Sequence, residues 1–144
     1  MTESYRIDLG NFEISTDRAR LNLDRIEAFL GDSYWVVGRP RDVIERSIEN
    51  SLCFGVYRKD DGLLVGFARV VTDYSTFSWL ADVYVDPAQR GAGLGKALVH
   101  AVVAHPALAG VRMALTSRDA HGLYAQFGFE ALPHSERWML RADS

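Results

Sequence analysis

Three strand-like segments follow one another in the middle of the chain, with only short polar turns between them: 52–58, 63–72 and 77–85. The first turn contains Asp61-Gly62, a dipeptide that supplies the positive φ angles of a tight hairpin. The last segment is rich in aromatic and β-branched residues and ends at Asp86-Pro87. The pattern therefore predicts an antiparallel unit of three strands at the centre of the fold.

Helical patterns, with apolar residues three and four positions apart, occur on both sides of this unit. The strongest begins at Leu94 and is closed by Pro106. An earlier helix begins near Pro40, and its predicted buried stripe is Val43, Ile44 and Ile48. The remaining predicted elements are strands at 12–16, 111–115 and 136–141, a helix at 22–30, and a helix from Ser117 or Asp119 through 126.

The order of these elements combines antiparallel hairpins with one strand–helix–strand crossover. It predicts an α/β (α+β mixed) fold, in which a central mixed, mostly antiparallel sheet of six to seven strands carries four helices on both faces. A length of 144 residues fits one domain, 1–144. The single cysteine, Cys53, excludes a disulfide framework, and the scattered histidines show no metal-ligand spacing, so no metal is expected.

The N-terminus has no basic segment followed by an apolar stretch, and no apolar run reaches membrane-spanning length. We therefore expect a cytoplasmic protein without a membrane partner. A net charge of −3 argues against nucleic-acid binding. The segment 87–118 nevertheless contains four basic residues and no acidic one. This segment suits a small anionic ligand, although an apolar stretch can also contain few acids by chance.

The strongest chemical signal is the glycine-rich turn 89–96, with the sequence Q-R-G-A-G-L-G-K, where a strand ends and the amphipathic helix begins. Helix N-termini present unpaired N–H groups that bind anions, and glycines let a ligand approach the backbone. A nucleotide-hydrolysing P-loop is excluded because Arg90 and Ala97 stand where it needs Gly and Ser or Thr. The glycine spacing also differs from the dinucleotide-binding pattern. Tight packing of a strand against a helix is the alternative explanation.

The turn contains R-x-x-G-x-G at Arg90, Gly93 and Gly95, and a second motif, H-G-L-Y-A-Q-F-G-F, follows at 121–129. In these motifs and in element order, nearly the whole chain resembles the GNAT acetyltransferase superfamily. The resemblance implies a single N-acetyltransferase domain whose sheet splays at its middle, where acetyl-CoA binds without a metal. It implies direct attack by a primary amine of a small molecule or peptide. A catalytically silent acyl-CoA-binding sensor or interaction domain is the alternative, and a homodimer is compatible with either.

The resemblance makes Tyr124 the expected general acid that protonates the departing thiolate, and a tyrosine that only packs one face of an amphipathic helix is the alternative. Asp82, an acid in an otherwise apolar strand, is the expected general base or water holder, and a carboxylate bonded to a backbone N–H or an arginine is the alternative. Asp73 and the Ser117 hydroxyl are reserve candidates. The expected coenzyme contacts are backbone groups of Val83 and Val85 for the pantetheine arm, Arg90, Gly91, Ala92, Gly93, Leu94, Gly95 and Lys96 for the diphosphate, and Ser117.

Aromatic residues and arginines mark the expected acceptor side. These are Tyr34, Trp35, Arg39 and Arg41 before the second helix, and Tyr74, Phe77 and Trp79 near the opposite rim. Aromatic rings in such a place either form a cage for a cation or cover the core. The arginines indicate an acceptor that carries a carboxylate.

Overall fold

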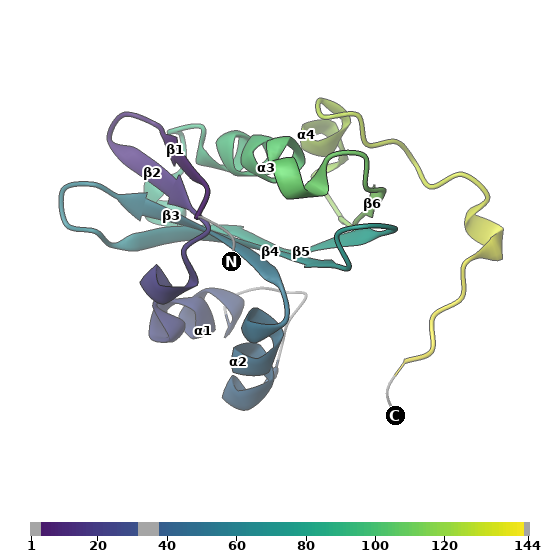
Figure 1. Cartoon of the computed structure of the whole chain (residues 1–144), viewed down its shortest axis with the longest axis horizontal. Helices are drawn as coiled ribbons and strands as arrows, with labels where there is room; N and C mark the ends of the chain where they lie inside the picture. The colour runs from purple at the N-terminus through teal and green to yellow at the C-terminus, as the bar shows by residue number, and fades with distance from the viewer. Residues whose placement is uncertain (1–3, 32–37, 143–144) are drawn as a thin grey trace.

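A six-stranded sheet, in the order β1-β2-β3-β4-β5-β6, forms the middle layer of the molecule (Figure 1). The computed structural model describes residues 4–31 and 38–142. The strands are β1 (Arg6–Asp8), β2 (Phe12–Ser15), β3 (Leu52–Arg58), β4 (Leu64–Thr72), β5 (Ser78–Val85) and β6 (Met113–Ala114). Neighbouring strands are antiparallel except β5 and β6, which are parallel. The predicted mixed, mostly antiparallel sheet is confirmed.

Helices cover both faces of the sheet, as predicted. One face carries α1 (Leu23–Gly31) and α2 (Arg41–Glu49), and the other carries α3 (Leu94–Ala104) and α4 (His121–Ala125) (Figure 1). Short 3-10 helices are found at η1 (Arg18–Arg20), η2 (Pro87–Gln89), η3 (Pro106–Leu108) and η4 (Ser135–Arg137). The parallel pair β5 and β6 is joined through α3, which is the predicted strand–helix–strand crossover.

Each face of the sheet has its own hydrophobic core. Under α3 the core includes Leu98, Val99 and Val102 of the helix and Phe54, Val70 and Leu80 of the sheet. Under α1 and α2 it includes Ile26, Phe29, Ile44 and Ile48 of the helices and Cys53, Leu64 and Phe67 of the sheet. Because the two cores lie on opposite faces, β5 contributes side chains to both of them.

The turns follow the local chemistry of the sequence. Gly62 adopts a φ of 75° in the turn between β3 and β4, as the Asp-Gly pair predicts. At the start of α1, the Asn22 side-chain oxygen accepts a hydrogen bond from the Arg25 N–H at 3.1 Å. Gly128, shortly after α4, has a φ of 90°, a conformation that favours glycine after a helix end.

Several predictions of local structure are wrong in detail. β1 was missed, because its three residues form a short hairpin arm with β2 and show too little pattern to recognise. Val43 is exposed, because α2 turns the neighbouring Ile44 toward the core instead. The strand predicted at 111–115 is paired only at Met113 and Ala114. The helix predicted from Ser117 or Asp119 starts only at His121, because the Ser117 hydroxyl accepts from the Ala120 N–H and forms a turn before it.

The strand predicted at 136–141 is also wrong. Ser135–Arg137 forms the 3-10 helix η4, and the described residues after it belong to no sheet ladder. A strand needs a neighbour with unpaired backbone groups, and here the chain runs out beyond the sheet (Figure 1). The strand-like pattern therefore finds no neighbouring strand in its own chain.

The orientation of α2 can be tested by truncating two neighbouring side chains of the helix, Ile44 and Val43. Ile44 is 2% exposed and Val43 is 38% exposed. Ile44→Ala should lower the free energy of unfolding by about 3 kcal/mol, because it leaves a cavity under the helix. Val43→Ala should change it by less than about 0.5 kcal/mol. Urea denaturation measures both, and equal losses would contradict the observed helix orientation.

Candidate active site

β5 has strand neighbours on both sides only at its beginning. Its parallel ladder with β6 consists of Ser78–Met113 and Trp79–Ala114, whereas its ladder with β4 continues to Val85. From Leu80 onward, therefore, one edge of β5 faces no strand among the described residues. The predicted splay of the sheet is confirmed, and it leaves main-chain groups of β5 available to an extended ligand.

A β-bulge interrupts β5 beside this opening. Phe67 pairs with Tyr84 and Arg69 with Ala81, so Asp82 and Val83 together lie opposite a single residue of β4. Asp82 has a φ of 49°, a left-handed conformation that non-glycine residues rarely adopt. The bulge directs the Asp82 side chain to Arg69 of β4, while Val83 packs against the core under α3.

Two arginines hold the Asp82 carboxylate. Its Oδ2 accepts from Arg39 Nη1 at 2.9 Å and from Arg69 Nε at 2.8 Å, and the Asp82 side chain is only 2% exposed. Arg69 also donates to the hydroxyl of Ser51 at 3.1 Å, just before β3. Of the two interpretations of Asp82, the carboxylate bonded to arginine is therefore present. The role as a general base stays a prediction.

The glycine-rich turn leads from β5 into α3. Gly93 is the N-cap residue, has a φ of 74° and provides no side-chain cap. Among the residues that the structure describes, the first N–H groups of α3 therefore have neither intrahelical nor capping partners. The first turn contains no acidic residue and includes Lys96. The dipole and the basic side chain both favour a bound anion here.

The surroundings of the glycines decide between ligand binding and tight packing. A Cβ atom on Gly91, Gly93 or Gly95 would meet nothing within 4 Å. Positive φ angles explain glycine at Gly91 and Gly93, but Gly95 has neither a positive φ nor a close neighbour. Internal packing therefore does not require the glycines, and open space lies in front of the helix N-terminus.

A hollow of about 310 Å³ begins at this turn. It is lined by Gly93, Lys96, Ala97 and His100 of α3 and by Phe127 just after α4. Tyr124 of α4 is almost buried, and its ring meets Phe129 edge-on with centroids 5.8 Å apart. Tyr124 packs in the same core cluster as Leu80 of β5. The two sequence motifs thus meet beside the splayed strand.

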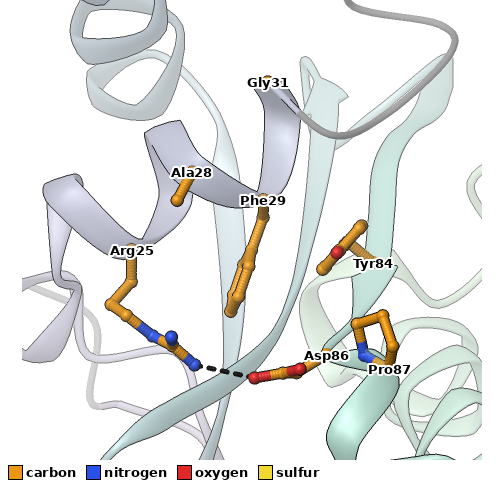
Figure 2. A pocket seen from close by; sticks show the side chains of 7 residues that line it. All are labelled: Arg25, Ala28, Phe29, Gly31, Tyr84, Asp86 and Pro87. Atoms are coloured by element: carbon orange, nitrogen blue, oxygen red, sulfur yellow. Dashed lines mark hydrogen bonds and ion pairs between the residues drawn. The ribbon is translucent and has the colours of Figure 1, made fainter.

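A larger pocket, of about 420 Å³, opens on the α1 side of the sheet (Figure 2). Its lining consists of Arg25, Ala28, Phe29, Gly31, Tyr84, Asp86 and Pro87. The rings of Phe29 and Tyr84 are stacked with centroids 4.7 Å apart. Arg25 pairs with Asp86 at 3.0 Å and also donates to the carbonyl of Leu64. The pocket combines an aromatic wall with an ion pair.

Asp86 is held in its charged form. The N–H of Ala88 and the guanidinium of Arg25 donate to its carboxylate, and these hydrogen bonds lower its pKa below the ordinary value. This pocket was not predicted from the sequence, in which Asp86 marked only the end of a strand. The spacing of two between Tyr84 and Asp86, at the end of β5, was the available signal.

The predicted acceptor-side residues that the structure describes do not line this pocket. Arg39 is bound to Asp82, and Arg41 is bound to Asp24 at 2.7 Å and Glu27 at 2.9 Å on α1. Tyr74 is exposed in the turn between β4 and β5, and Phe77 faces Trp138 and Arg112. Trp79 is partly buried on β5, and Tyr34 and Trp35 lie outside the described residues. The described members of the predicted acceptor cluster are therefore dispersed.

Other candidates have structural surroundings. Asp73 accepts hydrogen bonds from the hydroxyl of Thr76 and from the N–H groups of Thr76, Ser75 and Phe77, which lower its pKa and make it a turn residue. Burial raises the pKa of Cys53 to about 12, as expected for a core thiol. Among residues 4–31 and 38–142, no three His, Cys, Asp or Glu side chains are grouped to hold a metal. The helices described are too short or too polar to span a membrane.

The sequence profile of the Acetyltransferase (GNAT) family matches residues 21–129, which include the glycine-rich turn and α4. The chain belongs to the GNAT family. A crystal structure of a proposed GNAT acetyltransferase from Xanthomonas campestris pv. campestris is 42% identical, has a TM-score of 0.89, and aligns over 94% of this chain and 96% of that chain. A proposed acetyltransferase from Gibberella zeae is 33% identical over 105 residues, 60% of this chain and 59% of the relative.

A more distant GNAT-fold structure contains the coenzyme. N-acetylglutamate synthase from Neisseria gonorrhoeae, complexed with coenzyme A and N-acetyl-glutamate, has a TM-score of 0.68 at 20% identity, over 90% of this chain and 32% of that chain. At this identity the likeness concerns the fold alone. The chain spans 48% to 59% of the length of the curated relatives it matches.

The ion pairs at Asp82 should be important for the stability of this GNAT chain. Arg69→Gln should lower the free energy of unfolding by about 3 kcal/mol, because it removes one partner of a buried carboxylate. Arg46→Gln is the control, because Arg46 is exposed and pairs only weakly with Asp42, at 3.8 Å. Urea denaturation at neutral pH measures both variants. A loss for Arg69→Gln no larger than that of the control would refute the assigned role.

Proposed function

We propose that this protein is an N-acetyltransferase that transfers the acetyl group of acetyl-CoA to a primary amine of a small molecule or peptide. The observation that carries the proposal is the start of α3, where glycines face open space at the end of a strand with a free edge. Membership of the GNAT family supports the same donor. Because the chain covers only part of its curated relatives, the activity of the whole protein is part of the proposal.

The residues around the turn fit a coenzyme with a diphosphate. We expect the N–H groups from Gly91 to Lys96 to bind the diphosphate, with Arg90 and Lys96 adding positive charge. We expect main-chain groups of Val83 and Val85, which lie beyond the part of β5 that pairs with β6, to bind the pantetheine arm. Acetyl-CoA supplies the acetyl group as an activated thioester.

Two side chains are proposed to move protons. The amine nitrogen bonds to the acetyl carbon, the carbon–sulfur bond breaks, and Tyr124 gives its phenolic proton to the departing sulfur. The amine loses a proton to Asp82, directly or through a water molecule. Arg39 and Arg69 both donate to Oδ2 of Asp82 and hold the carboxylate in place at the bulge.

The pocket in Figure 2 is the proposed entrance for the acceptor. It lies on the α1 side of β5, opposite the face that α3 covers, so donor and acceptor would approach the strand from different sides. The ion pair of Asp86 with Arg25 offers polar contacts, and the Phe29 and Tyr84 rings offer apolar contact. These features favour an acceptor amine with polar groups on an apolar or aromatic body.

The cellular location and the extent of the domain are also part of the proposal, and both rest on the sequence alone. We propose a single acetyltransferase domain over 1–144 and a cytoplasmic location. One relative, from Arabidopsis thaliana, is named chloroplastic, so a test of location belongs with any test of activity in cells.

Coenzyme binding can be tested at two glycines with the same backbone conformation. Gly93→Asp should abolish the binding of acetyl-CoA, because it places a carboxylate among the proposed phosphate contacts. The positive φ at Gly93 strains any side chain, so the control must carry the same strain. Gly110→Asp is the matched control, because Gly110 has a φ of 76° against 74° at Gly93 and also faces open space. Isothermal titration calorimetry that finds equal affinities for the two variants would refute the proposed diphosphate site.

The role of Tyr124 can be tested with a second buried tyrosine as the control. Tyr124→Phe should lower kcat by about 10²-fold with little change in acetyl-CoA affinity, because it removes only the proton donor. Tyr57→Phe should leave kcat unchanged, because the Tyr57 hydroxyl is buried without a hydrogen-bond partner in the described part of the chain. Thiol release with a panel of amines gives the rates.

Two results would contradict the proposed mechanism. Unchanged kcat in Tyr124→Phe would exclude its role as general acid. Tight binding of acetyl-CoA with no thiol release for any amine would favour an acyl-CoA-binding sensor instead.

A further inference from the structure

The C-terminal segment, residues 130–142, has a strand-like sequence but lies outside the folded layers (Figure 1). Each of its residues is exposed. Met139 is 97% exposed and Leu140 is 92% exposed, and Leu132 and Trp138 are also large exposed apolar residues. Single exposed apolar side chains are common, but a run of three on a segment that covers no core indicates a contact surface.

The contacts of this segment with its own chain are few. The ring of Trp138 lies 6.3 Å from that of Phe77, just before β5. Its recorded backbone hydrogen bonds, Arg137 to His134 and Trp138 to Ser135, both lie within the η4 turn. Beyond Trp138 the chain runs away from the sheet (Figure 1), which leaves Met139 and Leu140 in solvent.

The sheet has a matching free edge at β6. This strand is last in the sheet order and pairs only with β5, so its other edge has no strand neighbour within the described residues. Met113 of β6 and Leu115 after it are only partly buried. An edge with unpaired backbone groups is a template for another strand.

Apolar contact favours the same pairing. The C-terminal segment contains Glu130 and Glu136 but also Arg137 and Arg141, so it has no net charge. The added strand would therefore be held by main-chain hydrogen bonds to β6 and by contact of its apolar run, 138–140, with the partly buried side chains of β6.

We propose that the C-terminal segment of one chain adds as a strand to β6 of a second copy, and that the exchange is reciprocal. Such an exchange gives a two-fold dimer in which each chain supplies one segment and one edge. A second copy is favoured over the chain's own edge because the segment leaves the body beyond the sheet tip. When extended, residues 130–142 reach about 40 Å, which is enough to cross to a neighbouring molecule. This dimer is independent of the proposed activity.

Cross-linking between two different single-cysteine variants tests the exchange. Both variants carry Cys53→Ala, which removes the native cysteine. The first variant also carries Met139→Cys in the C-terminal segment. The second variant has an affinity tag and carries Thr116→Cys at the exposed position after β6. After mixing and incubation to allow exchange, a short thiol cross-linker should give a tagged heterodimer. Asp60→Cys in the distant turn between β3 and β4 replaces Thr116→Cys as the control and should give little product.

The mass in solution gives a second, independent measurement. The full chain should show twice the 16.1 kDa of one chain by light scattering after gel filtration. The double substitution Met139→Glu and Leu140→Glu should give a monomer that keeps its circular dichroism spectrum, because both residues are exposed in the single chain. A monomeric full chain, an unchanged dimer in the double variant, or cross-links only within one chain would each overturn the proposal.

Discussion

The sheet is open because β5 pairs with β6 at only two positions while its other edge pairs with β4 almost to the end. The strand therefore has a continuous antiparallel neighbour on one side and a free main chain on the other. Since α3 begins only a short turn beyond β5, its unpaired N–H groups lie at the end of this free edge. Backbone N–H groups of a strand and of a helix are thus both available at the opening between β5 and β6.

Two arginines from neighbouring segments hold the bulge in β5 in place. Asp82 takes a left-handed backbone conformation, and Arg39 and Arg69 bind its carboxylate from positions before α2 and within β4. A buried ion pair contributes little net stability, because desolvation offsets most of the attraction. Its effect is positional: it joins the α1–α2 layer, β4 and the proposed reaction centre in one network.

The two faces of β5 offer different contacts. On the α3 side, the turn offers N–H groups, Arg90 and Lys96 to an anion. On the α1 side, an aromatic pocket contains the ion pair of Arg25 with the ionised Asp86. This difference suits a reaction in which an anionic donor and a second substrate meet across one strand.

The sequence by itself determined the features whose causes lie within a few residues. Asp61-Gly62 predicted the hairpin, the apolar spacing after Leu94 predicted α3, and the glycine turn and the tyrosine motif together indicated the family. Only the tertiary structure decided the partners of Asp82 and the pocket that contains Arg25 and Asp86. It also decided that residues 136–141 form no strand. Turns and helices depend on local backbone geometry, whereas ion pairs, pockets and strand pairing need segments distant in sequence to meet. A strand-like segment becomes a strand only where another edge is within reach.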